Sequence, residues 1–233
     1  MFSENIFNGK ECCNCHRKCS MFSHLSTEEM RYIEENRYEA RFKSGEVIFK
    51  QGSPTSHIVS FSTGLAKLYM EAHNQRDVII SLVQPTTLIG GPGLYIDGRH
   101  KFSLAALMDC NVCFIDIKPF KELIKSNSNF AVSLIEDISL KDFRLMQRLV
   151  NTSIKQSHGR MAETLLYLSD TVFEKGEFDI VLSRQELADI TGMSKEGAIR
   201  ILKEFKNDGL IECDNQNFKI LDTRRLEEIS LNG

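Results

Sequence analysis

The sequence contains no tryptophan, only four prolines and no low-complexity tract, and its apolar runs are short. Runs such as residues 78–83 fall far below the roughly 20 apolar residues that a membrane-spanning helix needs. The N-terminal residues lack the apolar segment of a secretory signal peptide, so we expect a cytoplasmic protein. With 42% hydrophobic and 26% charged residues, the 233-residue chain has an ordinary globular composition and room for two modest domains.

Motifs of common enzyme classes are also missing. The chain has no P-loop, no G-x-S-x-G, no H-E-x-x-H and no paired-carboxylate pattern. Residues 90–93 are glycine-rich, but they lack the Lys-Ser/Thr pair and the helix start of a phosphate loop. We therefore expect a protein that is not an enzyme.

An excess of positive charge, the usual mark of a nucleic-acid-binding protein, is absent too. The net charge is −3, and after His158 the chain carries 10 Lys and Arg against 15 Asp and Glu. A DNA-binding function must therefore depend on where the cations lie, because the net charge argues weakly against it.

The chain divides into two regions with different sequence patterns. Residues 42–117 consist of short β-rich runs separated by glycines and polar turns, which predicts an antiparallel roll or sandwich. Before them, Ser26 begins a sequence with the form of a helix capping box. After Pro119 the pattern becomes helical, with a short helix over about 119–125 and a long one over about 129–154.

The long helix carries a seam with three-four spacing. The seam consists of Ala131, Leu134 or Ile135, Ile138, Asp142, Leu145, Leu149 and Thr152. A second copy of the same helix is the economical partner for such a seam. The alternative is that the stripe packs back on its own domain.

The remaining residues have the order of a winged helix-turn-helix. His158-Gly159 resembles a hinge, and an amphipathic helix follows it. A strand is predicted over 178–182, then two helices, then a hairpin formed by 210–212 and 218–221.

The two helices carry the sharpest motif in the sequence. Ser183 and Glu186 form a capping box that starts the first helix. Ala188 is small where a second helix must cross closely, and Gly192 suits the tight turn between the helices. Ser194 is placed to cap the second helix, in which Ala198, Ile201 and Leu202 form the predicted buried face.

The exposed face of the second helix matches DNA chemistry. Arg can bind guanine O6 and N7 in a bidentate manner, Glu can accept from cytosine N4, and an exposed Ile fits a thymine methyl. Residues 194–206 carry a local charge of +2. The predicted DNA-binding residues are Ser183, Ser194, Lys195, Glu196, Ile199, Arg200 and Lys203. The alternative is a winged helix used only for protein contacts.

With these residues the chain resembles the CRP/FNR family of regulators over essentially its whole length. The resemblance lies in residues 183–186 and 194–202 of the DNA-binding segment, and more loosely in Gly45, Gly52, Gly64, Leu88-Ile89-Gly90 and Phe120–Ile124. It implies an α+β fold with an N-terminal antiparallel β-roll of the cyclic-nucleotide-binding type, a long dimerisation helix and a C-terminal winged helix-turn-helix.

The resemblance also implies a homodimer on an inverted-repeat DNA operator, with Glu196 and Arg200 reading a TGA-like core in each half-site. Ile199 stands where relatives commonly have a small residue, so the bases outside that core are open. RNA polymerase is a further expected partner. We expect a Cys-rich tail (1–20), a sensor roll (21–128), a dimerisation helix with hinge (129–157) and a DNA-binding domain (158–233).

The sequence says less about the signal to which the predicted sensor roll responds. A cyclic-nucleotide cassette of the form G-E-L followed by R-S is similar to Gly90-Gly91-Pro92 and Lys101-Phe102 here, but the ribose-binding carboxylate and the Arg-Ser clamp are missing. We therefore do not expect cAMP as the ligand. Haem or another small molecule remains open, although no spacing singles out a ligand among His57, His73 and His100.

Cysteines offer another possibility. Cys12, Cys15 and Cys19 lie near the N-terminus, and Cys113 lies on the last predicted strand of the roll. Sensors of the FNR type similarly use three N-terminal cysteines and one from that strand to hold an iron–sulfur cluster, so the resemblance implies a [4Fe-4S] cluster. Cys13 and Cys110 are substitute ligands, and the same thiols could instead bind zinc, form a redox pair or be idle.

Overall fold

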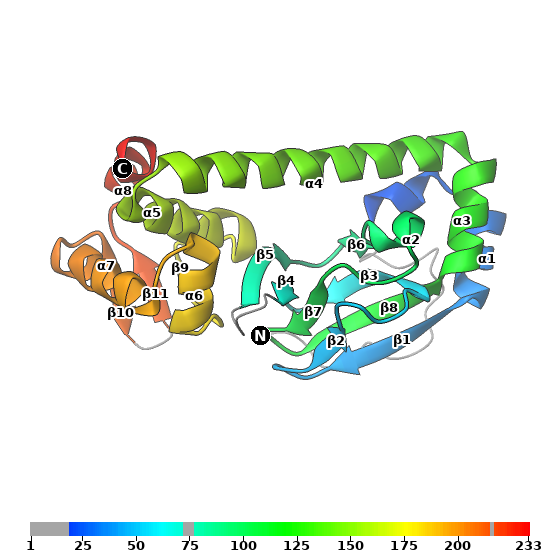
Figure 1. Cartoon of the computed structure of the whole chain (residues 1–233), viewed down its shortest axis with the longest axis horizontal. Helices are drawn as coiled ribbons and strands as arrows, with labels where there is room; N and C mark the ends of the chain where they lie inside the picture. Colours follow the sequence, from blue (N-terminus) through cyan, green and yellow to red (C-terminus); the bar gives the residue numbers. More distant parts are fainter. Residues whose placement is uncertain (1–18, 72–76, 215–216) are drawn as a thin grey trace. The chain divides into compact units, whose positions relative to one another are not determined.

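The computed structural model describes residues 19–71, 77–214 and 217–233 (Figure 1). Cys12, Cys13, Cys15 and His73 lie outside the described residues. The chain forms two compact units. One comprises the residues up to Ala66 together with Val83–Leu140, and the other comprises Lys67–Leu82 together with Lys141–Gly233.

Antiparallel strands make up the N-terminal roll, as predicted. They form two four-stranded sheets, with orders β1-β8-β3-β6 and β2-β7-β4-β5, and the strand pairs with a defined register in the roll are antiparallel. The strands are β1 (Arg37–Phe42), β2 (Val47–Phe49), β3 (His57–Thr63), β4 (Ala66–Glu71), β5 (Asp77–Val83), β6 (Leu88–Ile89), β7 (Ser103–Ala106) and β8 (Cys110–Asp116).

Gly64 allows the turn between β3 and β4 to lie against β8. Its φ is +91°, in the left-handed region that favours glycine. A Cβ at this position would stand 2.6 Å from the Cβ of Cys110 and 2.5 Å from the carbonyl oxygen of Asp109. Gly64, one of the residues that carry the family resemblance, is therefore required by both its backbone angle and its neighbours.

Helices around the roll share its core. They are η2 (Ser20–His24), α1 (Thr27–Glu35), the short α2 (Gly93–Ile96) and α3 (Ile117–Ser126). The capping box predicted at Ser26 is present at the start of α1. In the core, the ring of Phe130 stacks with Phe22 at 6.2 Å between centroids and meets Phe120 edge-on at 5.5 Å. These contacts hold the start of the long helix, where Phe130 and Ser133 are buried.

The long helix α4 runs unbroken from Ser128 to Ile154, as predicted (Figure 1). Its seam is exposed in the single chain, with Ile135, Ile138, Leu145 and Leu149 at least half exposed. Asp142 is exposed as well. The described residues therefore leave the stripe open from Ile135 to Leu149, whereas Leu134 packs partly against the core of the roll.

The C-terminal elements follow the predicted order of a winged helix-turn-helix. They are α5 (Ser157–Tyr167), η3 (Leu168–Val172), β9 (Glu177–Asp179), α6 (Arg184–Thr191), α7 (Lys195–Asn207), β10 (Ile211–Asp214), β11 (Asn217–Ile220) and α8 (Thr223–Asn232). The strands form one sheet with order β10-β11-β9. None of the described helices is long and apolar enough to cross a membrane.

Two local predictions for this region were displaced. The break after α4 falls at Lys155 and Gln156, so the expected hinge residues His158 and Gly159 lie in the first turn of α5. Strand β9 ends at Asp179, three residues before the predicted end at Leu182, because its pairing with β11 covers only three residues. Buried Ile180 and Leu182 instead contribute to the core as the chain approaches α6.

Candidate nucleic-acid interface

The first helix of the motif, α6, begins with the predicted capping box. The Ser183 hydroxyl accepts a hydrogen bond from the Glu186 N–H at 3.2 Å, and the Glu186 carboxylate accepts one from the Ser183 N–H at 2.9 Å. These bonds satisfy backbone donors that a helix start otherwise leaves unpaired. They fix where α6 starts and hold Glu186 at its base.

The turn between α6 and α7 has the conformation that the sequence predicted. Gly192 ends α6 in the left-handed region with a φ of +65°, and the Met193 N–H donates to the Ala188 carbonyl at 3.0 Å. Ala188 is fully buried, as the close crossing requires. The Ser194 hydroxyl then accepts from the Gly197 N–H at 3.0 Å and caps α7.

Helix α7 separates its buried and exposed faces as predicted. Ala198, Ile201 and Leu202 are buried, together with Phe205, which the sequence reading did not assign. The predicted base-reading and phosphate-binding side chains form an exposed row on the other side of the helix; they are Lys195, Glu196, Ile199, Arg200 and Lys203. Ser183 and Ser194 are exposed at the starts of their helices.

Glu204 lies between His158 and Arg200 on this module. One carboxylate oxygen is 2.7 Å from Nε2 of His158 on α5, and the other is 3.9 Å from Nε of Arg200. The Arg200 side chain remains 68% exposed. Because an exposed pair at this separation contributes little, Glu204 leaves the guanidinium available to an incoming ligand.

The wing is tied to both helices. The Arg184 guanidinium carbon lies 5.1 Å from the centroid of the Phe218 ring on β11. From α7, the Lys206 ammonium donates to the Cys213 carbonyl at 2.8 Å and to the Asp214 carboxylate at 3.0 Å. The bond to Asp214 raises the pKa of Lys206. Both contacts hold the hairpin β10–β11 against the helix-turn-helix.

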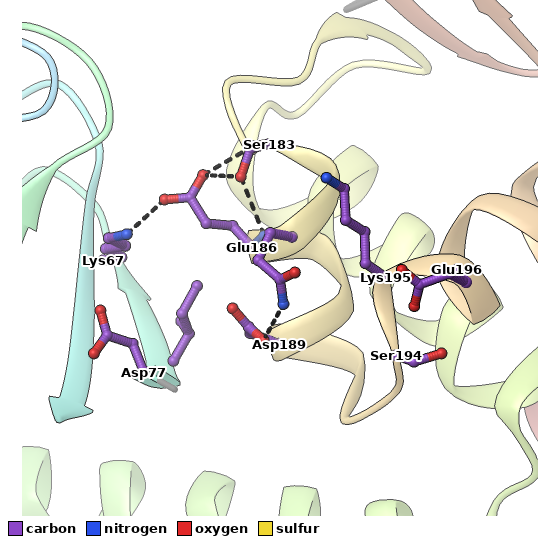
Figure 2. A pocket seen from close by; sticks show the side chains of 10 residues that line it. Lys67, Asp77, Ser183, Glu186, Asp189, Ser194, Lys195 and Glu196 are labelled. Atoms are coloured by element: carbon purple, nitrogen blue, oxygen red, sulfur yellow. Dashed lines mark hydrogen bonds and ion pairs between the residues drawn. The ribbon is translucent and has the colours of Figure 1, made fainter. Parts of the chain in front are cut away.

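A cavity of about 700 Å³ opens beside the motif (Figure 2). Its lining includes Ser183, Glu186 and Asp189 of the α6 segment and Ser194, Lys195 and Glu196 at the start of α7. The hairpin β4–β5 supplies Lys67, Asp77 and Ile79. Sequence reasoning did not find the hairpin residues, since no motif connects them to a segment more than 100 positions away.

Lys67 forms the direct link across the cavity. Its ammonium lies 2.6 Å from a Glu186 carboxylate oxygen, and about four-fifths of each side chain is covered, with exposures of 20% and 18%. Burial alone would raise the pKa of Glu186, but hydrogen bonds from Lys67 and Ser183 outweigh it and lower that pKa. The carboxylate is therefore held in its charged form.

The region that resembles a cyclic-nucleotide cassette does not fit such a ligand. A Cβ at Gly91 would stand 2.9 Å from the Phe102 ring, so that ring occupies the space for a side chain there. Lys101 pairs with Asp97 at 2.5 Å, and the Arg99 guanidinium donates to the Gly52 carbonyl at 2.8 Å. Both nearby cations are thus engaged within the roll. Among the described histidines, burial lowers the pKa of His100.

Two of the predicted cysteine ligands belong to the same core cluster. Cys19 is buried in the cluster that includes Phe22 and Ile115, and Cys113 packs against it. Arg37 donates to the Cys113 sulfur at 3.5 Å. No group of three metal-binding side chains occurs in the described part of the chain, which leaves out Cys12 and Cys15.

Cys110, a substitute ligand in the sequence reading, has a different environment. Cys110 and Cys113 are three positions apart on β8. Because successive side chains of a strand point to opposite faces of the sheet, these two cysteines lie on different faces. Burial, with Asp109 and Glu46 nearby, raises the pKa of the Cys110 thiol to about 11. Burial thus disfavours the thiolate, which is the form that binds metals, at Cys110.

Two family models match the chain. Residues 39–127 match the cyclic nucleotide-binding domain, and residues 159–229 match the Crp-like helix-turn-helix domain. The nitrogen fixation regulation protein FixK of Bradyrhizobium diazoefficiens is 25% identical over 229 residues, covering 96% of this chain and 95% of that protein. The cAMP-activated global transcriptional regulator CRP of Salmonella typhimurium is 24% identical over 188 residues, covering 79% and 90%.

A solved structure shows the same fold. The structure of FixK2 from Bradyrhizobium japonicum superposes with a TM-score of 0.76 at 18% identity, covering 83% of this chain and 96% of that one. The order of roll, long helix and helix-turn-helix is therefore shared.

Proposed function

Because the chain belongs to the CRP/FNR family of transcriptional regulators, we propose that it binds an inverted-repeat DNA operator as a homodimer. The observation that carries the proposal is the exposed row Lys195, Glu196, Ile199 and Arg200 at the start of a capped helix. The N-terminal end of a recognition helix is the part that enters the major groove. Residues 158–233 would bind DNA, with Ser183, Ser194 and Lys203 near phosphates.

The experiment is a selection of duplexes from a randomised library, followed by mobility-shift titration of the full chain. A selected inverted repeat with half-sites about one helical turn apart is expected. RNA polymerase, as the partner of such a regulator, can then be tested by transcription from that site. Failure to enrich any duplex would contradict the DNA function.

Dimerisation is proposed through residues 129–157. Support comes from the seam on α4, whose apolar residues Ile135, Ile138, Leu145 and Leu149 are exposed in the single chain. A left-handed coiled coil of two α4 helices with this spacing would bury these residues against the same residues of the second copy. Sedimentation of the purified chain should show a dimer, and a monomer at high concentration with operator DNA present would contradict the proposal.

Asp142 in the middle of this seam is expected to weaken the dimer. Two carboxylates would approach each other across the two-fold axis, which costs free energy. Asp142→Ala should therefore lower the dimer dissociation constant, by roughly fivefold for an effect of about 1 kcal/mol. Sedimentation equilibrium measures this directly, and Asp137→Ala on the same helix serves as the control. Weaker association of Asp142→Ala would contradict the arrangement.

For the signal, we propose that Cys12, Cys15, Cys19 and Cys113 hold a [4Fe-4S] cluster. Cys19 and Cys113 pack in or against one core cluster, and thiolates are the donors that such clusters require. The cluster would supply a group that oxygen or nitric oxide dismantles. Cys19 and Cys113 would then connect the loss of the iron–sulfur cluster to the hydrophobic core of the roll, which also contains Phe130 at the start of α4. Zinc bound by the same thiols is the second candidate.

Cys113→Ser is expected to abolish the cluster. The anaerobically purified protein should be brown with iron and sulfide bound, and the variant should be colourless because one thiolate is lost. Cys213→Ser, in the winged module, is the matched control and should keep the colour. A folded wild-type protein that is colourless and cannot be reconstituted would refute the cluster, and metal analysis would identify zinc.

A further inference from the structure

The hairpin β4–β5 is fastened to the first helix of the DNA-binding motif at both ends of that helix. At the start of α6, Lys67 pairs with Glu186 at 2.6 Å (Figure 2). At its end, the Arg148 guanidinium of α4 donates to the Ile190 carbonyl at 2.8 Å and also to the Ile80 carbonyl of β5. One side chain thus joins the hairpin, α4 and α6.

The fastened hairpin stands beside the groove-entering end of α7. Lys67, Asp77 and Ile79 line the same cavity as Ser194, Lys195 and Glu196 (Figure 2). Its volume of about 700 Å³ is that of a small-molecule pocket. A DNA duplex, which must bring its phosphate backbones along both sides of an inserted helix, needs far more room.

The charges in the cavity oppose DNA as well. Four carboxylates, those of Asp77, Glu186, Asp189 and Glu196, line it together with the two lysines Lys67 and Lys195. DNA carries one phosphate charge for every 1.7 Å or so of its axis. In this arrangement Lys67 is paired with Glu186, and Asp77 lies with Lys67 on the hairpin side of the cavity, across from the start of α7 (Figure 2).

We propose that the β4–β5 hairpin is a clamp that hinders DNA binding by the helix-turn-helix, and that breaking the Lys67–Glu186 ion pair opens this clamp. This inference rests on the proposed DNA-binding function. Glu186 suits the role because the Ser183 hydroxyl and N–H stay bonded to its carboxylate after Lys67 departs. The clamp therefore opens without unfolding the start of α6.

The test is the sign of the change in DNA affinity for Lys67→Gln. If Lys67 contacted phosphate, its removal would weaken DNA binding. If Lys67 instead holds the clamp through Glu186, its removal strengthens DNA binding. We expect Lys67→Gln to bind the library-selected duplex about three- to tenfold more tightly than wild type. Glu186→Gln should act in the same direction, because glutamine keeps the capping box but loses the charge.

Lys101→Gln is the matched control. It removes a lysine from an exposed ion pair with Asp97 on the roll and should leave the affinity for the duplex unchanged. Hydrogen exchange without DNA gives a second readout: Lys67→Gln should accelerate exchange of the amides in β5 and leave those of α1 unchanged.

The outcomes separate the two ideas. If wild type and variants bind the duplex equally, or if Lys67→Gln binds more weakly, the clamp is overturned and the DNA function stands. If neither wild type nor any variant binds any duplex, the DNA function itself fails. Unchanged exchange in β5 would also overturn the clamp, whatever the result with DNA.

Discussion

Arg200→Ala is expected to remove discrimination at one guanine in each half-site. The Arg200 side chain is 68% exposed on the outer face of α7, and its only recorded ion pair is the long contact with Glu204 in the described chain. A bidentate bond to guanine O6 and N7 contributes about 1–3 kcal/mol of discrimination, so specificity there should fall roughly five- to 150-fold. Competition titrations with duplexes altered at each position measure this loss.

Lys203→Ala is the control for Arg200→Ala. Lys203 lies one helical turn further along α7 and is exposed. If it meets phosphate, its loss should weaken specific and non-specific DNA about equally and lower the dependence of affinity on salt by about one ion. If Arg200→Ala keeps the wild-type sequence preference, the placement of the reading face on α7 is wrong.

Leu145→Glu is expected to dissociate the proposed dimer and abolish operator binding with it. Leu145 follows Asp142 in the seam of α4 and is half exposed in the single chain. In a paired helix it would be buried against its symmetry mate, and a glutamate there would lose that burial and add a second pair of facing carboxylates. The free energy of dimerisation should become less favourable by an amount on the order of 3–5 kcal/mol.

Gln147→Glu is the matched control. With 3.6 residues per turn, position 147 lies on the side of α4 opposite the seam formed by Ile138, Asp142 and Leu145. It introduces the same carboxylate at an exposed site and should leave the dimer intact. Sedimentation and mobility shift of both variants test the pairing, and a dimeric Leu145→Glu protein would place the interface elsewhere.

The local details of the DNA-binding motif were readable from the sequence because each depends on neighbouring residues. Ser183 with Glu186, the left-handed Gly192 and the capping Ser194 all form bonds or angles within a few positions of the chain. The boundaries of α4 followed from an uninterrupted helical pattern that ends near Ile154. These features require no knowledge of the rest of the fold.

Local patterns were less reliable where tertiary packing sets the limit of an element. Strand β9 was predicted to reach Leu182, but pairing with β11 supports only Glu177–Asp179. The expected hinge at His158 was displaced: the break falls at Lys155 and Gln156, and His158 contacts Glu204 of α7 from within the first turn of α5. Apolar and glycine-rich stretches indicate where an element is possible, whereas its partners decide where it ends.

By itself, the sequence determined the family, the order of roll, long helix and helix-turn-helix, and the residues on each face of α7, since periodicity and capping are local. Only the tertiary structure placed Lys67 beside Glu186 and Arg148 between two backbone carbonyls. It also set Phe102 against Gly91 and gave Cys110 and Cys113 different surroundings on one strand. Such contacts join residues from separate elements, and their charges and burial arise only when the chain brings those elements together.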